Sequence, residues 1–245
     1  MQQNLGFAHF LAQTDDVGRF LLGTLALMSL ATWYLIVSKA WSNWAMRRRS
    51  NEFMRHFWAA TDMQEVATYL RRNGVRDPFS HLTHHGLRAA EQHRERSGKR
   101  MVEAGSADDF LTRALRRAME QDTARLEYGH TVLASVASSA PFVGLFGTVW
   151  GIYHALLAIG MSGQGTLDKV AGPVGEALIM TALGLAVAIP AVLAYNASTR
   201  ANRMLLAELD GFAHDLFAFM STGNRNEAPQ PSSRPIMLRP VGEAA

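Results

Sequence analysis

Three long stretches of apolar residues, almost free of charge, alternate with charged segments along the chain. The first, 20–38, would form a helix roughly 28 Å long, which matches the thickness of a bilayer core. The second runs from Tyr128 to Leu167 without one Asp, Glu, Lys or Arg, and the third runs from Val170 to Thr199 with a single charge, Glu176. This pattern predicts an all-α integral membrane protein with three transmembrane helices.

The predicted segments follow from the ends of the apolar stretches and from the turn and proline signals between them. The second and third transmembrane helices are expected to extend into the cytoplasm, and four of the chain's eight prolines fall in the last 23 residues, which predicts a disordered tail. In chain order the segments are a periplasmic N-terminus 1–19, transmembrane helix 20–38, a cytoplasmic helical region 39–130, transmembrane helix 131–160, a periplasmic turn 161–169, transmembrane helix 170–199, a cytoplasmic helix extension 200–222 and the tail 223–245.

The orientation is predicted from the distribution of basic residues. Of the 24 Lys and Arg residues, 17 lie in 39–130 and 5 follow Thr199, whereas 1 lies in 1–19 and 1 in 161–169. The positive-inside rule therefore places the N-terminus in the periplasm and the C-terminus in the cytoplasm. A cleaved signal peptide would need basic residues before its apolar core, and here they follow it. The net charge of +3 is explained by this asymmetry and by binding to anionic lipids, so no nucleic-acid partner is inferred.

Apolar residues at helical spacing continue beyond the membrane segments on the cytoplasmic side. After a helix start at Ser106, Asp108 and Asp109, apolar residues recur at steps of three and four up to Leu126, and no break signal precedes the second apolar stretch. We therefore expect one long helix that passes from the cytoplasm into the membrane. The stretch from Arg203 to Met220 extends the third helix in the same way.

Small residues and prolines are concentrated in the second and third apolar stretches. Small side chains let helix backbones approach, so this density favours tightly packed helices and a homo-oligomer. Prolines free a backbone carbonyl one turn earlier, which predicts a bend in each helix. The residues are Gly144, Gly147, Gly151 and Gly184 for packing, and Pro141 and Pro190 for the bends.

Glu176 departs most from what an apolar helix requires. An ionised carboxylate in the apolar layer is costly, and burial raises a carboxyl pKa towards neutrality. One interpretation is a proton-accepting group in a conduction path, which Thr148 and Thr181 would extend. The other is a carboxyl that lies in the headgroup zone or holds helices together as a protonated donor. The residues alone leave both interpretations open.

Other kinds of site find little support in the sequence. His81, His84 and His85 have helical metal-ligand spacing, but no cysteine or clustered carboxylate completes a ligand set, so we expect a solvated helix face and no metal site. No nucleophile, zinc or nucleotide-binding motif is present, so neither an enzyme nor a cofactor is expected. A secondary transporter would show internal repeats and more spans. A passive scaffold explains everything except Glu176.

Three segments resemble the signature of the MotA/TolQ/ExbB proton-channel family. They are APFVGLFGTVWGI from Ala140 to Ile152, AGPVGEAL from Ala171 to Leu178, and TALGLAVAIPAVLAYN from Thr181 to Asn196. The match spans about a third of the chain and includes the glycines, prolines, threonines and the glutamate together. The segments AGPVGEAL and LDGFAHDL, the latter from Leu209 to Leu216, are more similar to the ExbB branch than to the TolQ branch.

This resemblance implies a subunit of a bacterial inner-membrane complex with ExbD and TonB, which uses proton-motive force to drive TonB-dependent uptake of iron-siderophore, haem or vitamin B12. It also implies a homopentamer with ExbD helices in its pore, which Glu176, Thr148 and Thr181 would line. A TolQ-type subunit of the Tol-Pal motor is the alternative. The resemblance covers the cytoplasmic region and the tail poorly, so their contacts are left open.

Overall fold

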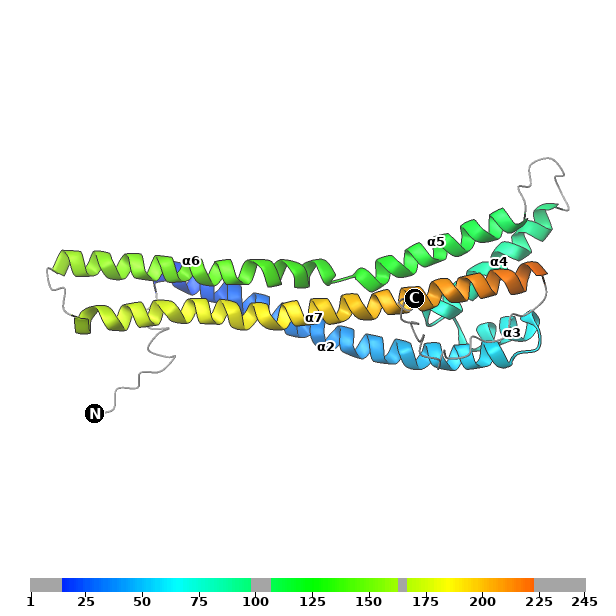
Figure 1. The fold of residues 1–245 in the computed structure, drawn as a ribbon, viewed down its shortest axis with the longest axis horizontal. Helices are drawn as coiled ribbons and strands as arrows, with labels where there is room; N and C mark the ends of the chain where they lie inside the picture. Colours follow the sequence, from blue (N-terminus) through cyan, green and yellow to red (C-terminus); the bar gives the residue numbers. More distant parts are fainter. Residues whose placement is uncertain (1–14, 98–106, 163–166, 223–245) are drawn as a thin grey trace, which may run out of the picture. The chain divides into compact units, whose positions relative to one another are not determined.

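The computed structural model describes residues 15–97, 107–162 and 167–222, and within these ranges all regular structure is α-helical (Figure 1). The segment 223–245, predicted to be a disordered tail, lies outside the described residues, as do most of 1–19 and residues 163–166 of the predicted turn. The helices are α2 Asp16–Ala59, α3 Met63–Asn73, α4 Pro78–Ser97, α5 Ala107–Glu127, α6 His130–Ser162 and α7 Leu167–Thr222.

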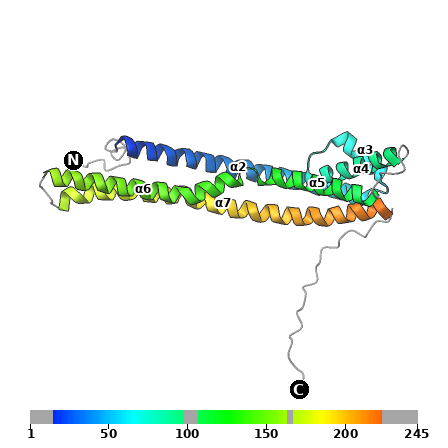
Figure 2. The same cartoon turned by 90° about the horizontal axis from the view of Figure 1, so that it is seen from above.

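The helices form two compact units, and α2, α5 and α7 contribute to both. The first unit contains the described residues up to Arg47 together with Gln121–Ala207, and the second contains Arg48–Glu120 and the rest of α7 from Glu208. In the first unit, Figures 1 and 2 both show α6 and the first half of α7 side by side. The predicted all-helical fold is confirmed for the described part of the chain.

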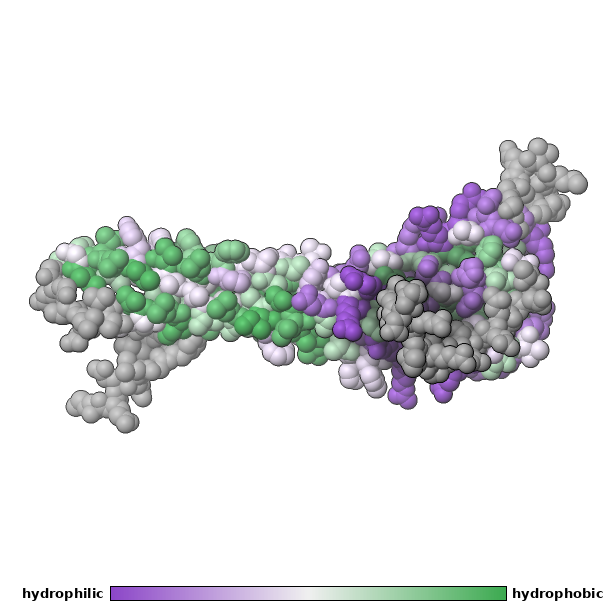
Figure 3. Space-filling model, in the orientation of Figure 1, coloured by the Kyte–Doolittle hydropathy of each residue, from purple (hydrophilic) through white to green (hydrophobic). Residues whose placement is uncertain are grey.

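The three apolar stretches form helices that are long and apolar enough to cross a membrane, which agrees with the predicted number of spans. Large apolar side chains on these helices are exposed, among them Leu30, Phe142 and Leu193 at 73%, 70% and 64%. Figure 3 shows hydrophobic side chains covering the visible face of α6 and the first half of α7. Such a surface is expected where lipid or other apolar helices surround the protein.

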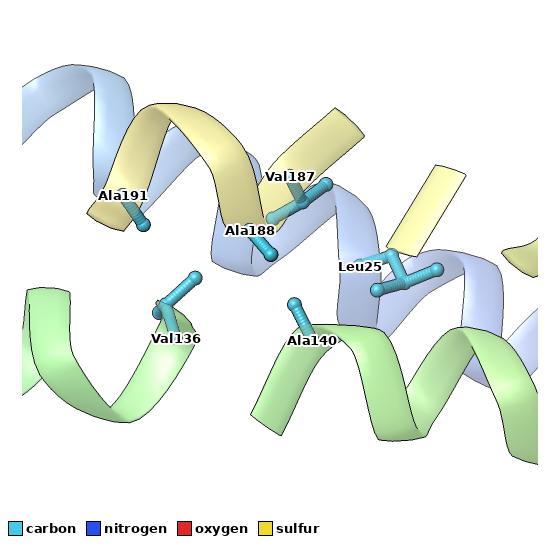
Figure 4. Close-up of a cluster of buried hydrophobic side chains, with 6 residues drawn as sticks. All are labelled: Leu25, Val136, Ala140, Val187, Ala188 and Ala191. Atoms are coloured by element: carbon cyan, nitrogen blue, oxygen red, sulfur yellow. The ribbon is translucent and has the colours of Figure 1, made fainter. Parts of the chain in front are cut away.

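The core of the first unit is made mostly of small side chains. Figure 4 shows that Leu25 of α2 meets α6 and α7 at one cluster. Three of its six members are alanines, and small side chains allow the three helix backbones to approach closely. The members are Leu25, Val136, Ala140, Val187, Ala188 and Ala191.

The second unit has an aromatic core. The ring of Phe212 of α7 packs edge-on against Phe57 at 4.8 Å, Phe79 at 5.4 Å and Phe53 at 6.4 Å between ring centroids. Helix α3 ends at Asn73, because the next residue, Gly74, adopts φ +74° and its amide donates to the Leu70 carbonyl. Helix α4 thus packs through Phe79 on Phe212 of α7, and α3 packs through Tyr69 on Phe53 of α2.

The expected unbroken helix from the cytoplasmic region into the second apolar stretch is wrong. Helix α5 ends at Glu127 and α6 begins at His130, and Figure 1 shows the non-helical residues between them. The physical reason is Gly129, which adopts φ +79°, a left-handed conformation that ends helices and that residues with a Cβ rarely adopt. By contrast, α7 continues without a break to Thr222, so the helix expected to extend the third apolar stretch is present.

Candidate functional site

The predicted small residues bring α6 and α7 into backbone contact. A Cβ atom built on Gly144 would lie 2.7 Å from the carbonyl oxygen of Met180, and one built on Gly184 would lie 2.7 Å from the carbonyl oxygen of Ala140. Both distances are far shorter than a carbon atom tolerates, so only glycine fits at these two positions. The glycine-lined face of α6 is therefore used within one chain.

The other two glycines face side chains of α7. A Cβ atom on Gly147 would meet the Cε atom of Met180 at 2.6 Å, and one on Gly151 would meet the Cβ atom of Ala177 at 3.0 Å. The end of a methionine side chain is flexible and can move aside, whereas a backbone carbonyl cannot. The contact is thus less demanding at Gly147 than at Gly144, although Gly147 and Gly151 form the GxxxG motif that the sequence displays most clearly.

This close contact brings Thr148 and Thr181 together. Their hydroxyl oxygens lie 2.5 Å apart, and the Thr148 hydroxyl also lies 3.2 Å from the carbonyl oxygen of Ala177 and 3.1 Å from that of Gly144. Thr148 is 7% exposed and Thr181 is half-buried. Since a hydroxyl group donates one hydrogen and accepts others, this pair can pass a proton or orient a water molecule inside an otherwise apolar contact.

Glu176 belongs to α7 and directly precedes Ala177, whose carbonyl oxygen faces the Thr148 hydroxyl. The side chain of Glu176 lies outside the described residues. Pro141 lies inside α6 and Pro190 inside α7. The bends that we expect at these two prolines stay predictions, as do the pore-lining roles of Glu176, Thr148 and Thr181.

A polar contact that the sequence did not predict joins the start of α2 to α6. The indole Nε1 of Trp150 donates to one carboxylate oxygen of Asp15 at 2.7 Å, and the other oxygen accepts from the backbone amide of Gly18 at 2.9 Å. Asp15 therefore caps α2 and holds Trp150 at the same time. Desolvation raises the pKa of Asp15, but these two hydrogen bonds and the charge of His154 together lower it below its usual range.

The three histidines considered as metal ligands lie on α4. The ring centroids of His81 and His85 are 4.5 Å apart, and those of His84 and His85 are 6.1 Å apart. Burial and the neighbouring Arg88 and His81 lower the pKa of His84. Among the described residues, no group of three His, Asp or Glu side chains is arranged to hold a metal ion.

The comparison with protein families decides which class of membrane protein this is. Residues 77–210, which include the α6–α7 contact, match the model of the MotA/TolQ/ExbB proton channel family. The chain belongs to this family. As a member of the MotA/TolQ/ExbB family, it is a channel-type transport protein.

Individual members of the MotA/TolQ/ExbB family match over most of the chain. The chain is 42% identical over 229 residues to the biopolymer transport protein ExbB of Xanthomonas campestris, which covers 90% of each chain. It is also 42% identical to ExbB of Neisseria meningitidis, over 82% of this chain and 89% of the relative. The Tol-Pal system protein TolQ of Pseudomonas aeruginosa is 32% identical, over 86% of this chain and 90% of the relative. The ExbB relatives are therefore more similar to it than this TolQ.

Proposed function

We propose that this chain is a proton-channel subunit of the inner membrane that works with ExbD and TonB. In this role it uses proton-motive force to drive TonB-dependent uptake of iron-siderophore complexes, haem or vitamin B12 across the outer membrane. The 42% identity to ExbB proteins supports the assignment to this branch, whereas the TolQ relative is 32% identical. A TolQ-type role in the Tol-Pal system is the second candidate, and complementation of strains that lack either subunit distinguishes the two.

The observation that carries the proposal is the hydroxyl pair Thr148–Thr181 inside the apolar contact between α6 and α7. A purely structural contact between membrane helices needs small or apolar side chains, and the glycines already supply them. The Thr148 hydroxyl lies 3.2 Å from the carbonyl oxygen of Ala177, and the residue before Ala177 is Glu176, the only charged residue from Val170 to Thr199. Ionisable and hydroxyl groups together inside a membrane helix bundle are typical of proton relays.

A complete channel requires more than one copy of this chain. In their described parts, the three apolar helices pack on one another through a core in which three of six side chains are alanines, and their outer faces expose many large apolar side chains. Closed rings of identical subunits are the common way to enclose a central path. We therefore infer a homo-oligomer, with five copies and a central ExbD helix as the family resemblance implies.

Proton uptake by vesicles that contain the purified complex with ExbD tests the proposal. The wild type, Glu176→Gln and Glu176→Asp are compared under an imposed pH gradient. Glutamine keeps the volume and most hydrogen bonds but cannot release a proton, so uptake should be lost while the complex still assembles. Aspartate is shorter but ionisable and should retain part of the uptake. Glu208→Gln, an exposed carboxylate of the same helix, is the matched control and should leave uptake unchanged.

Two results would contradict this function. Wild-type proton uptake by Glu176→Gln at equal protein content would show that the carboxylate is structural or only makes the path polar. Absence of any proton uptake by the wild-type complex, with the oligomer intact, would argue against a channel role altogether. Loss of uptake in the Glu208→Gln control would mean that the assay reports the general state of α7.

A further inference from the structure

The turn between α5 and α6 leaves a backbone carbonyl that needs a partner. The last carbonyls of a helix lack the amide donors of a following turn, and the left-handed Gly129 ends α5 at this point. Backbone hydrogen bonds at the turn run from the Tyr128 amide to the Arg125 carbonyl at 3.4 Å and from the Leu133 amide to the Gly129 carbonyl at 3.2 Å, and neither uses the carbonyl of Leu126. The carbonyl of Leu126 is instead satisfied by side chains.

Two donors from two other helices converge on this carbonyl oxygen. The ammonium nitrogen Nζ of Lys39 in α2 donates at 2.9 Å, and the side-chain amide Nδ2 of Asn202 in α7 donates at 2.8 Å. A carbonyl oxygen has two lone pairs, so the two bonds together use its full capacity. One atom of Leu126 therefore joins α2, α5 and α7 within the first unit.

The charge and the burial of the two donors suit this position. Asn202 is buried, with 7% of its surface exposed. Lys39 is the only charged residue between Arg19 and Arg47, and burial lowers its pKa. A cation is favoured at the C-terminal end of a helix, where the last carbonyls carry partial negative charge. Lys39 is one of the basic residues from which the membrane orientation is predicted, yet its ammonium group is directed inward, to a backbone carbonyl.

The imidazole ring of His130, the first residue of α6, adds a third polar group at the turn between α5 and α6. The ring of His130 packs edge-on against Tyr195 of α7, with 5.9 Å between the ring centroids. Its Nε2 atom is buried and has no hydrogen-bond partner among the described residues. Burial and the charge of Lys39 lower the pKa of His130, whereas Glu127 opposes them. His130 therefore reports directly on the presence of the Lys39 charge.

We propose that Lys39 and Asn202 are positioning residues that clamp the α5–α6 turn through the Leu126 carbonyl and so fix the first turn of α6 against α2 and α7. Thr148 lies on the same helix, five turns further on, so a loose start of α6 disturbs the contact in which it takes part. The link to proton conduction rests on the proposed function, whereas the clamp itself does not.

The variants separate the hydrogen bonds from the charge. Lys39→Met and Asn202→Leu each remove one donor, and the double variant removes both. Lys39→Arg keeps a cationic donor, and Lys39→Gln keeps a donor without the charge. Arg47→Met, an exposed cation of the same helix, is the matched control and also tests the other use of a cation here, binding to lipid headgroups.

Hydrogen exchange of residues 126–131 in the purified oligomer measures the clamp. Lys39→Met and Asn202→Leu should each speed exchange about tenfold. The double variant should exchange less than a hundredfold faster than the wild type, because both donors share one acceptor and their effects are not additive. Lys39→Arg and the control Arg47→Met should exchange at the wild-type rate. The pKa of His130, measured by NMR titration, gives a second readout. The His130 signal is assigned as the one that is missing from the spectrum of His130→Gln. The His130 pKa should rise in Lys39→Met and Lys39→Gln and return to the wild-type value in Lys39→Arg.

The proposal is overturned if Lys39→Met and Asn202→Leu both exchange at the wild-type rate, or if the His130 pKa is the same in Lys39→Met and the wild type. It is also overturned if Arg47→Met speeds exchange as much as Lys39→Met, because the cation would then act through lipid. If Lys39→Met fails to assemble, the His130 pKa is compared between Lys39→Gln and Lys39→Arg instead, and equal pKa values in these two variants overturn the proposal.

The link between the clamp and conduction is tested by proton uptake. Loss of proton uptake in the clamp variants, with uptake intact in the wild type, links the clamp to conduction. A wild type without proton uptake but with the expected exchange pattern would refute the proposed function and leave the clamp standing.

Discussion

Gly144 of α6 and Gly184 of α7 face each other so closely that a Cβ atom added to either one would lie 3.0 Å from the Cα atom of the other. The same two Cβ atoms would lie 2.7 Å from backbone carbonyl oxygens, and backbone cannot move aside without shifting a helix. This contact sets the distance between the two helices that carry Thr148 and Thr181. The hydroxyl pair depends on the short distance between α6 and α7, and this distance is possible because Gly144 and Gly184 have no side chains.

We predict that Gly144→Ala and Gly184→Ala destabilise the protein by about 1–3 kcal/mol, the typical cost of overpacking a filled contact. Gly147→Ala should cost less, because the three nearest atoms all belong to the Met180 side chain and the nearest, at 2.6 Å, is its flexible end. Gly147→Leu should again cost on the order of 1–3 kcal/mol. Thermal unfolding of the detergent-solubilised protein measures the differences. Native mass spectrometry of the same samples shows whether the oligomer persists.

Gly211→Ala is the matched control for the glycine series. Gly211 lies in α7, and a Cβ atom added to it would meet no other atom within 4 Å, so alanine should stabilise the helix by roughly 0.5–1 kcal/mol. Equal effects of alanine at Gly144 and at Gly211 would contradict the close contact between α6 and α7.

The start of α2 provides a prediction about pH. Asp15→Ala removes a helix cap and the acceptor for Trp150, so it should destabilise the protein by about 1 kcal/mol or somewhat more. The neighbouring Asp16→Ala should change little, because Asp16 forms only an exposed pair with Arg19 at 3.7 Å. Unfolding of the two variants and of the wild type, followed by circular dichroism, gives the comparison.

The sign of the pH dependence follows from the direction of the pKa shift. The pKa of Asp15 is lowered from 3.8 in the folded protein, so its contribution to stability is fully present above this value and is lost as the pH falls through the lowered pKa. The stability difference between the wild type and Asp15→Ala should therefore be constant from about pH 5 to 8 and shrink only in stronger acid. A difference that disappears near neutral pH would contradict the role of the Asp15 carboxylate in this contact.

The sequence predicted the elements that leave a periodic or compositional trace. Apolar stretches without charge identified the three membrane helices, and the density of glycine identified the face of α6 that packs most closely. The choice among the glycines could not be predicted, because it depends on which residue of α7 lies opposite. Gly147 and Gly151 form the visible motif, yet Gly144 makes the tighter backbone contact.

The contacts that the sequence missed join residues far apart in the chain. Trp150 and Asp15 are 135 positions apart, and Leu126 is 87 positions from Lys39 and 76 from Asn202. Hydrogen bonds of this kind leave no pattern along the sequence. The break at Gly129 could not be predicted either, since glycine is frequent inside membrane helices and a lone glycine near the start of an apolar stretch does not by itself indicate a helix end.

The orientation in the membrane can be tested directly. The excess of Lys and Arg in 39–130 predicts that a reporter fused after Ala104 is cytoplasmic and that one inserted at Gly163 is periplasmic. Two reporters are fused at each site. Alkaline phosphatase is active only in the periplasm, whereas a fluorescent protein of the suitable kind folds only in the cytoplasm, so at each site one reporter checks the other. Periplasmic labelling of 39–130 would overturn the orientation.

The last prediction separates the chemistry of the Thr148 hydroxyl from its packing. Thr148→Val keeps the shape of the side chain and loses the hydroxyl, and the remaining Thr181 hydroxyl can still bond to the Ala177 carbonyl one turn before it. The fold should therefore lose only about 0.6 kcal/mol, the average for a hydrogen bond between membrane helices. Thr148→Ser keeps the hydroxyl but loses a buried methyl group, which should cost about 0.8 kcal/mol.

The two Thr148 variants are thus similarly stable, but they should differ in proton uptake. If the hydroxyl takes part in the proton path, uptake should fall at least tenfold in Thr148→Val and stay within about twofold of the wild type in Thr148→Ser, because transfer between hydroxyls needs the donor and not the methyl group. Vesicle uptake assays at matched protein content measure both. Equal uptake by the two variants would leave Thr148 with a role in holding α6 to α7, and the path would then have to run through Glu176 and the partner subunit without it.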